Sequence, residues 1–328
     1  MKKKVKVALV GSNFALKGYL PVIKKFKQLE LKIICSRNIL KIKNKINLSK
    51  KLFLESNWKK IFEKKIDLII CSVPPIIQEK ILIYNLKHKK KIIFEKPIST
   101  KYLKSKLITK KILRKKIPCE INLIFLNHPL FVKAKNLIYK KKLGKVLNYK
   151  IKWSFVSQDF NKRLKSWKTD ETKGGGIKNI FLTHILSYCE YLFGKNKLKN
   201  FKVSKVNFKN LRYKNKIYCE LENLNSIKGQ INIFTKKKGF QNHYIKIIFE
   251  KGYLELSTIS KDWTKNFKLK IYNKFKNKAP YARLSNKQKY LDGRSSQIHL
   301  LFAKFLKKSN YSHINYCLNA EKIINKIN

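Results

Sequence analysis

The stretch Asp67-Leu-Ile-Ile-Cys-Ser-Val-Pro-Pro75 and the later stretch Lys91-Ile-Ile-Phe-Glu-Lys-Pro97 decide the fold class of this chain. Each contains a short run of apolar residues, which is typical of a strand buried in a parallel sheet. Each then runs into a turn that exposes polar groups, and ligands of open α/β sheets bind at this carboxyl edge. We therefore expect Lys96, on a turn stiffened by Pro97, to reach a bound cofactor or substrate. The alternative is a solvated surface lysine.

Strand-like and helix-like patterns alternate through the first part of the chain. The predicted strands are Val5–Val10, Leu31–Cys35, Leu68–Val73 and Lys91–Phe94, and the predicted helices are Ala15–Leu29, Trp58–Phe62, Ile76–Lys87 and Tyr102–Arg114. Such alternation implies right-handed βαβ units and a parallel sheet. The sequence therefore predicts an α/β domain with a doubly wound parallel sheet over residues 1–118.

The pattern changes after Pro118. A helix over Pro129–Lys141 and a long strand over Val146–Phe155 come first, and Asn319–Ile327 is predicted to be a closing amphipathic helix. Between them, strand-like runs follow one another without helices: Phe201–Phe208, Lys216–Leu224, Ile227–Lys237, Tyr244–Phe249 and Tyr253–Ser257. Consecutive strands favour antiparallel pairing, so residues 119–328 are predicted to form an α+β domain.

The composition indicates a globular protein whose charge is not a nucleic-acid signal. Hydrophobic residues make up 44%, and the formal net charge is +60. Lys and Arg together number 78, but only six of them are Arg. Nucleic-acid readers usually cluster Arg with aromatic residues on one face, whereas these lysines are scattered along every segment. We expect no specific nucleic-acid partner.

The six cysteines show neither CxxC pairing nor the spacing of a metal site, so we expect no metal. Cys35 and Cys71 lie in apolar runs and are predicted to be buried thiols of a reduced, cytoplasmic protein. The apolar run Val7–Val10 is too short for a signal peptide. No run approaches about 18 apolar residues, so no membrane span is expected.

The turn after the first predicted strand has part of a dinucleotide-binding pattern. That pattern places glycines at the first, third and sixth positions, which here are Gly11, Asn13 and Leu16. Asn13 tolerates the left-handed conformation and is expected to replace the second glycine, whereas Leu16 is expected to hold helix and strand further apart. The strand before and the helix after provide the context that pyrophosphate binding requires.

Ser36-Arg37 follows the second predicted strand, where NAD-binding proteins carry an acidic residue for the ribose hydroxyls. A carboxylate would repel a ribose phosphate, whereas a hydroxyl beside an arginine accommodates one. This dipeptide favours NADP(H). The alternative is an ordinary surface arginine at a strand end.

A third feature is the segment Lys173-Gly174-Gly175-Gly176, which leads into a predicted helix containing His184. Three consecutive glycines let the backbone approach a ligand closely. A single histidine on an apolar helix is commonly a core residue, but the glycines and Trp167 upstream favour a functional His184.

With these segments in this order, the chain resembles the Gfo/Idh/MocA family, which includes glucose–fructose oxidoreductase and inositol dehydrogenase. The most specific matches are Glu95-Lys96-Pro97 and the triple glycine with His184 eight residues after Gly176. The resemblance covers nearly the whole chain, through Val7–Pro21, Asp67–Gln78, Phe94–Ser99, His128–Lys145, Trp167–Gly194 and Gly252–Leu256.

The resemblance implies a Rossmann domain over 1–118 and a substrate-binding and oligomerisation domain over 119–328, with an open, mainly antiparallel sheet. The free face of that sheet commonly forms the subunit contact, so a homo-oligomer, a dimer or a tetramer, is expected. Members usually transfer hydride between NAD(P) and a sugar or cyclitol hydroxyl. The expected substrate is therefore a small molecule, a sugar or nucleotide sugar, held partly by the loops Ser157–Asp170 and Tyr281–Arg294.

The resemblance also implies roles for single residues. Lys96 would orient the substrate hydroxyl, and His184 would be the general acid and base. The implied cofactor-binding residues are Gly11, Ser12, Asn13, Phe14, Ala15, Ser36, Arg37, Ser72, Val73, Pro74, Pro75, Gln78, Glu95 and Lys96. The implied substrate-binding residues are Lys96, Trp167, Asn179, Ile180 and His184.

The chain departs from the family pattern near His184. Ile180 stands where the family usually has an aspartate, and Asn179 beside it would point to another face of an α-helix. Ser187 and Leu182 also differ from the pattern, and its arginine before the second domain's first helix falls near Leu126. An alternative is therefore a catalytically degenerate member that binds NAD(P) as a sensor or structural protein.

Overall fold

The computed structural model describes residues 3–44, 52–157, 159, 166–208, 211–236, 238–275, 281–283, 290–307 and 312–327. The chain forms two compact units. The first comprises Met1–Leu123 and Lys289–Leu318, and the second comprises Ile124–Gln288 and Asn319–Asn328. The expected substrate loops Ser157–Asp170 and Tyr281–Arg294 lie partly outside the described residues.

The first unit is built on a six-stranded parallel sheet. Its strands are β1 (Val5–Val10), β2 (Leu29–Cys35), β3 (Phe53–Glu55), β4 (Leu68–Cys71), β5 (Lys91–Phe94) and β6 (Cys119–Ile121). Their order in the sheet is β3-β2-β1-β4-β5-β6. After β1 the chain adds strands on one side of it, and from β4 onward it adds them on the other side, so the switch point lies between β1 and β4. The predicted doubly wound sheet is confirmed, and the carboxyl ends of β1 and β4 mark the edge where this fold binds ligands.

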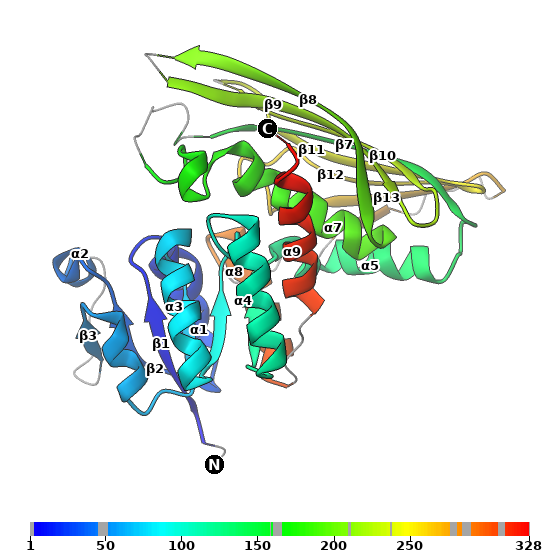
Figure 1. Ribbon diagram of the computed structural model, residues 1–328. Helices are drawn as coiled ribbons and strands as arrows, with labels where there is room; N and C mark the ends of the chain where they lie inside the picture. Colours follow the sequence, from blue (N-terminus) through cyan, green and yellow to red (C-terminus); the bar gives the residue numbers. More distant parts are fainter. Residues whose placement is uncertain are drawn as a thin grey trace. The chain divides into compact units, whose positions relative to one another are not determined.

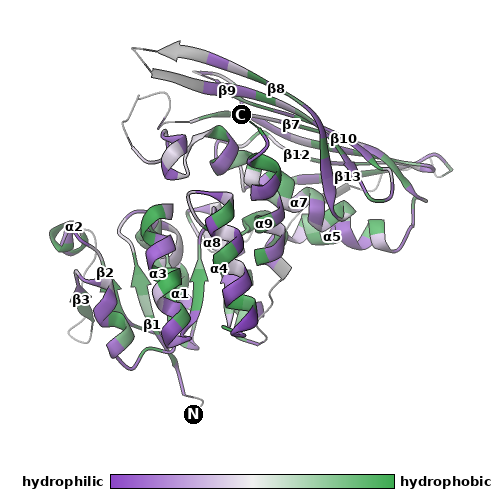
Figure 2. Cartoon of the chain, in the orientation of Figure 1, coloured by the Kyte–Doolittle hydropathy of each residue, from purple (hydrophilic) through white to green (hydrophobic). Residues whose placement is uncertain are grey.

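Helices cover both faces of this sheet, because right-handed crossovers on either side of β1 place them on opposite faces. They are η1 (Ala15–Tyr19), α1 (Leu20–Lys25), α2 (Ile39–Lys43), η2 (Trp58–Glu63), α3 (Pro75–His88), α4 (Tyr102–Arg114) and α8 (Gly293–Phe305). Figure 1 shows α3 and α4 side by side on one face. The strands between the layers are hydrophobic (Figure 2).

The α8 segment returns to the first unit although it lies near the end of the chain. Ile298, Leu301, Phe302 and Phe305 of α8 share one buried cluster with residues of β1 and α1. The compact units thus differ from the expected ranges 1–118 and 119–328, since apolar burial joins residues 289–318 to the Rossmann sheet. That residues 1–118 and 119–328 act as separate domains stays a prediction.

Several predicted elements match closely and others do not. The predicted bounds of β1, β5 and α4 agree with the structure. The helix expected over Ala15–Leu29 ends at Lys25, because Phe26 leaves the helical region (φ −93°, ψ 98°) and β2 begins at Leu29. The sequence did not predict β3 and β6, which have only three residues each and therefore carry little periodic signal.

The second unit contains an eight-stranded sheet in the order β14-β13-β12-β11-β7-β10-β9-β8. Its strands are β7 (Val146–Val156), β8 (Asn196–Phe208), β9 (Leu211–Asn223), β10 (Lys228–Lys236), β11 (Asn242–Phe249), β12 (Gly252–Thr258), β13 (Lys268–Asn273) and β14 (Tyr281–Arg283). Among the described residues of this sheet, β7 and β10 are the one parallel pair, so the expected mainly antiparallel sheet is confirmed.

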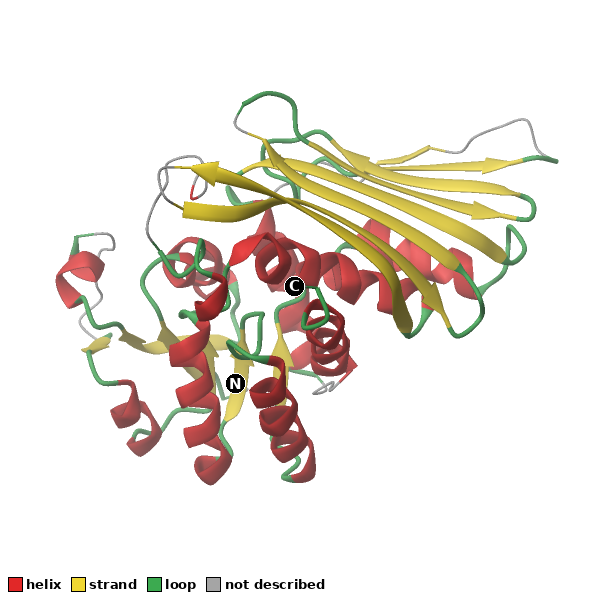
Figure 3. Cartoon of the chain, turned by 45° about the horizontal axis from the view of Figure 1, so that its top comes forward, coloured by secondary structure: helices red, strands yellow, loops and turns green. Residues whose placement is uncertain are grey.

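The helices of the second unit lie against one face of this sheet (Figure 3). They include η3 (Ile124–Asn127), α5 (Pro129–Tyr139), η4 (Glu171–Lys173), η5 (Lys178–Leu182) and α7 (Thr183–Phe193). Buried and partly exposed residues alternate along β11 and β12, as they do when one sheet face is covered and the other is open.

The last helix, α9 (Ser312–Ile324), begins seven residues before the predicted start at Asn319. All six cysteines are free and buried, as expected for Cys35 and Cys71. Within the described ranges, no helix has both the length and the apolar character needed to cross a bilayer.

Candidate functional site

The turn after β1 requires glycine at its first position. Gly11 has a φ of +126°, and a Cβ placed there would lie 2.2 Å from the carbonyl oxygen of Ser72. The backbone of Gly11 also donates a hydrogen bond to the carbonyl oxygen of Cys35 (2.9 Å). Gly11 thus joins the carboxyl ends of three neighbouring strands, β2, β1 and β4, in one tight turn.

The rest of this turn differs from the expectation. Asn13 was expected to take the left-handed conformation, but it is absent from the described non-glycine residues with positive φ. Phe14 already has helical backbone angles, and the chain enters the π-helix η1 at Ala15. Because the helical conformation already begins at Phe14, the turn does not require a left-handed backbone at Asn13. Leu16 is partly buried against the core.

Polar residues also follow β2 and β4. The backbone of Ser36 donates to the carbonyl oxygen of Glu55 (2.9 Å), and Arg37 beside it is exposed. The backbone of Ser72 donates to the carbonyl oxygen of Val10 (2.9 Å), and Val73 and Pro74 lead into α3 at Pro75. The predicted cofactor-binding segments 11–15, 36–37 and 72–75 therefore lie along one edge of the sheet.

The Glu95-Lys96-Pro97 turn is held by Gln78 of α3. The Gln78 amide nitrogen donates to the carbonyl oxygens of Glu95 (2.6 Å) and Pro97 (2.8 Å), and its amide oxygen accepts from the Glu95 backbone (2.9 Å). Gln78 is only 1% exposed, and the Lys96–Pro97 peptide is cis. The Gln78 amide thus holds the turn that carries Lys96, and the expected contact of Gln78 with the cofactor stays a prediction.

The Glu95 carboxylate lies in a small polar cluster. Its Oε1 accepts hydrogen bonds from the Tyr19 hydroxyl (2.6 Å) and the Asn122 amide nitrogen (2.8 Å). Burial raises the pKa of Glu95, while these bonds and the nearby charges of Lys96 and Arg294 oppose the rise. Burial, together with the Glu95 charge, holds the pKa of Tyr19 well above its usual value, so Tyr19 stays a neutral donor.

In the second unit, Gly175 and Gly176 pack against their own loop. A Cβ at Gly175 would lie 2.0 Å from the carbonyl oxygen of Trp167, and one at Gly176 would lie 2.6 Å from the Glu171 Cγ. The glycines were expected to let a ligand approach. Protein atoms lie close to both backbones on the side where a Cβ would stand, and the approach of a ligand to this loop stays a prediction.

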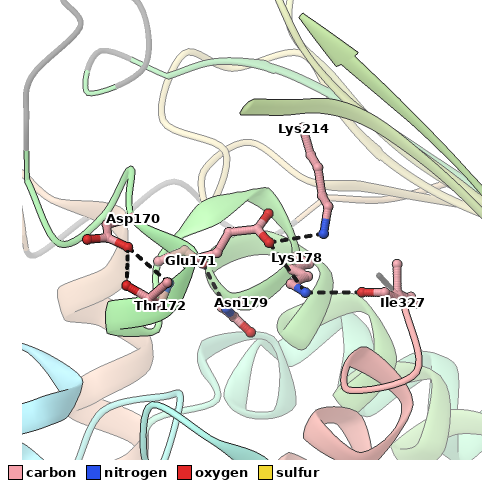
Figure 4. Close-up of polar contacts among 8 residues, drawn as sticks. Asp170, Glu171, Thr172, Lys178, Asn179, Lys214 and Ile327 are labelled. Carbon is pink, nitrogen blue, oxygen red and sulfur yellow. Dashed lines mark hydrogen bonds and ion pairs between the residues drawn. The ribbon is translucent and has the colours of Figure 1, made fainter. Parts of the chain in front are cut away.

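Glu171 ties this loop to other segments of the second unit (Figure 4). Its Oε2 lies 3.0 Å from the Lys214 Nζ and 3.4 Å from the Lys178 Nζ. The Lys178 ammonium also donates to the carbonyl oxygen of Ile327 (3.0 Å). The glycine loop is thereby fixed to β9 and to the chain after α9.

The residues before His184 form the π-helix η5 rather than an α-helix. A π-helix bonds residue i to residue i+5, so α-helical spacing does not place Asn179 and Ile180 relative to His184. The Asn179 amide nitrogen donates to the carbonyl oxygen of Gly175 (2.8 Å), and the Thr183 hydroxyl donates to the carbonyl oxygen of Asn179 (2.8 Å). The π-helix also falls where a functional site was predicted, which is common for this element.

His184 lies at the start of α7 within a cluster of aromatic rings. It is 5% exposed, and its ring centroid is 5.6 Å from that of Phe125 and 5.9 Å from that of Trp263. Trp263 also packs against Trp153 (5.2 Å). These rings exclude water from most of the imidazole.

A second histidine of this cluster was not predicted. His243 on β11 stacks on Trp153 (4.3 Å), and its Nε2 lies 3.0 Å from the Tyr188 hydroxyl. Its Nδ1 is buried and has no hydrogen-bond partner among the described residues. Burial, helped by the proximity of His128, lowers the pKa of His243 to about 3, so this imidazole is neutral in the folded protein at physiological pH.

This neutral imidazole predicts an acid-sensitive fold. The pKa of His243 is about 3 in the folded protein and near 6.5 in the unfolded chain, so only the unfolded chain binds the proton between these values. Stability is therefore complete above about pH 6.5 and falls by about 1.4 kcal/mol per pH unit for this group as the pH drops toward 4. Urea unfolding of wild type and His243→Phe at several pH values measures this, with a shallower slope expected in the variant. Parallel curves for the two proteins would contradict it.

The sequence missed Tyr19, Asn122 and His243, and it named Arg294 only as the end of an expected substrate loop. Of the three missed residues, only Asn122 gave a usable signal. It directly follows β6, so it is a polar residue at the carboxyl edge, as Ser36 and Ser72 are. Its Oδ1 is buried without a hydrogen-bond partner among the described residues. A buried, unsatisfied acceptor at a ligand-binding edge fits a site that takes a polar group such as an amide N–H. The residues along this edge therefore fit a bound dinucleotide.

No group of three or more His, Cys, Asp or Glu residues suited to a metal occurs in the part of the chain that the structure describes.

Comparisons with known proteins agree with this architecture. Residues 5–122 match the model of the oxidoreductase family's NAD-binding Rossmann fold, and residues 135–327 match that of its C-terminal alpha/beta domain. An uncharacterized oxidoreductase of Synechocystis sp. is 20% identical over 276 residues, covering 80% of this chain and 74% of the relative.

Solved structures show the same fold at low identity. A levoglucosan dehydrogenase in complex with NADH and levoglucosan is 14% identical, with a TM-score of 0.81 over 98% of this chain and 96% of that one. KijD10, a 3-ketoreductase from Actinomadura kijaniata in complex with NADP and TDP-benzene, is 13% identical, with a TM-score of 0.79 over the same shares, 98% and 96%. Given the two family matches, the chain belongs to the Gfo/Idh/MocA oxidoreductase family, with an NAD(P)-binding Rossmann domain and the family's C-terminal α/β domain.

Proposed function

We propose that this protein transfers hydride between a nicotinamide dinucleotide and a hydroxyl or carbonyl of a carbohydrate. The observation that carries the proposal is the placement of Lys96 at the carboxyl edge of the Rossmann sheet, on a turn fixed by Gln78 and beside the Glu95 carboxylate. A lysine held in this way suits the stabilisation of negative charge on a substrate oxygen.

Lys96 and His184 divide the chemistry in this proposal. The bound NAD(P) supplies the hydride acceptor or donor. Lys96 donates a hydrogen bond to the substrate oxygen and stabilises the charge that develops there. His184 accepts the hydroxyl proton during oxidation and returns it during reduction, which an imidazole does readily near neutral pH. Trp167, Asn179 and Ile180 are the proposed substrate neighbours.

The proposed cofactor preference is NADP(H). Arg37 is exposed at the carboxyl edge beside Ser36, and it forms no ion pair with any described residue. A guanidinium in this position is available to a phosphate on the adenosine ribose.

The proposed substrate class is a sugar or nucleotide sugar, and the proposed assembly is a homo-oligomer. Two proteins of the same fold were solved with levoglucosan and with TDP-benzene, which supports a carbohydrate or nucleotide-linked substrate. The open face of the eight-stranded sheet is the proposed subunit contact.

A nicotinamide absorbance assay tests the function. The purified protein is mixed with NADPH or NADP, then with NADH or NAD, across a panel of sugars, keto sugars and nucleotide sugars. We expect turnover with at least one class and tighter binding of NADPH than of NADH. His184→Ala should lose that turnover while it still binds the dinucleotide. Tighter NADH binding would contradict the cofactor preference alone.

A second candidate function is dinucleotide binding without catalysis, for sensing or for structure. Ile180 cannot exchange a proton, and Leu126 is apolar and only 2% exposed, so neither position supplies charge. A protein that binds NADPH but turns over no member of the panel would favour this function.

A further inference from the structure

Arg294 is brought to the dinucleotide turn by a distant part of the chain. It lies in the first turn of α8, and its guanidinium carbon is 4.2 Å from the centroid of the Phe14 ring. Phe14 belongs to the turn that follows β1, where a Rossmann fold holds the pyrophosphate. The guanidinium of Arg294 therefore lies at that turn.

The orientation of this guanidinium is fixed by Asp292. The Arg294 Nε donates to Asp292 Oδ1 (2.9 Å), and its Nη2 donates to Asp292 Oδ2 (2.6 Å). The Asp292 side chain is only 7% exposed. Burial alone would raise the pKa of Asp292, but the bonds and charge of Arg294 hold it below its usual value, so the carboxylate stays ionised. A two-bond pair of this kind holds the planar group more firmly than a single bond does.

The backbone that carries Arg294 is anchored to the same turn region. The Ser295 hydroxyl donates to the carbonyl oxygen of Gly18 (2.8 Å), and Ser295 is fully buried. Phe302, two turns further along α8, packs on Tyr19 at a ring distance of 6.2 Å. The charge of Arg294 also acts on Glu95 after β5, where it opposes the rise in pKa that burial causes. Arg294 is thus held at the carboxyl edge of the sheet, beside the turn that follows β1.

We propose that Arg294 binds the pyrophosphate of the dinucleotide, an inference that rests on the NAD(P) binding of the proposed function. An arginine stacked on an aromatic ring and oriented by a buried carboxylate is arranged in advance for a phosphate oxygen. The pyrophosphate is the matching part of the ligand because it lies at the β1 turn, whereas the adenosine ribose lies after β2. Arg294 would then bind the pyrophosphate, and Arg37 would bind the phosphate on the adenosine ribose.

Binding measurements with dinucleotide fragments test this assignment. The dissociation constants of NADPH, NADH and ADP-ribose are measured by calorimetry for wild type, Arg294→Gln and Arg294→Lys. All three ligands carry the pyrophosphate, so Arg294→Gln should weaken each by a similar factor, on the order of tenfold to a hundredfold. Arg294→Lys keeps the charge and should lose less. The salt dependence of NADH binding should also decrease in Arg294→Gln.

Arg114→Gln is the matched control, because Arg114 is an exposed arginine of the same unit at the end of α4. It should bind all three ligands as wild type does. The inference is overturned if Arg294→Gln binds like Arg114→Gln, or if it loses affinity for NADPH alone. If wild type binds none of the three ligands, the proposed function fails together with the inference. If Arg294→Gln folds poorly, the three dissociation constants of Arg294→Lys are compared with those of wild type. A similar loss for all three ligands supports the inference, and no loss overturns it.

Discussion

Lys96→Ala is expected to lower kcat by about 10²- to 10³-fold, with a much smaller change in the dissociation constant of the dinucleotide. The charge of Lys96 acts on the Glu95 carboxylate, which also accepts hydrogen bonds from Tyr19 and Asn122. In the proposed reaction the ammonium stabilises charge on the substrate oxygen, and this charge is largest in the transition state. The loss should therefore fall mainly on kcat.

The matched control is Lys101→Ala, because Lys101 is an exposed lysine only five residues further along the chain. Both variants are assayed by nicotinamide absorbance on the best substrate of the panel, and dinucleotide affinity is measured separately. Lys96→Arg keeps the charge in a different shape and should recover part of the rate. Equal rates in Lys96→Ala and Lys101→Ala would remove Lys96 from the mechanism.

The sequence predicted the Rossmann half well because its signals are local and strong. The buried parallel strands β4 and β5 appear as continuous apolar runs, and Pro74, Pro75 and Pro97 mark the turns that follow them. The order of elements then leaves few topologies, since right-handed crossovers restrict the choice. The doubly wound parallel sheet is therefore predictable, whereas the short edge strands β3 and β6 are not.

The parts that sequence reasoning missed depend on contacts between distant segments. Arg294 is 280 residues from Phe14, and no periodicity in α8 indicates that its first turn reaches the turn after β1. His243 occupies an ordinary buried position of an alternating strand. Its environment is set by contacts with Tyr188 and Trp153, which are distant in the sequence. The π-helix before His184 was also out of reach, because its sequence fits an α-helix equally well.

The triple glycine shows how one sequence signal can have more than one structural cause. Gly175 and Gly176 are required, as predicted, because a side chain at either position would collide with neighbouring atoms. The nearest of those atoms belong to Trp167 and Glu171. The requirement for glycine thus reports close packing of the loop, and the sequence alone does not tell which partner is close.

Gln78→Ala is expected to destabilise the first unit by about 2–5 kcal/mol, since it leaves buried backbone groups without partners and opens a small cavity. The lost bonds are those to the Glu95 backbone nitrogen and to the carbonyl oxygens of Glu95 and Pro97. Urea unfolding measures the change, with Gln28→Ala as the control because Gln28 is exposed at the end of the loop before β2. A midpoint equal to that of Gln28→Ala would show that the Gln78 amide does not hold the turn.

Gln78 should also matter for turnover, although it acts only through the turn that carries Lys96. At a temperature where Gln78→Ala is fully folded, kcat should fall while the dinucleotide dissociation constant changes little. Gln78→Glu provides a sharper comparison, because it keeps the size of the side chain but replaces the donating amide with an acid. In its ionised form that acid would face the carbonyl oxygens of Glu95 and Pro97, whereas its protonated form could still donate one hydrogen bond. The kcat of Gln78→Glu relative to wild type should therefore rise as the pH is lowered, a dependence that loss of stability alone would not produce.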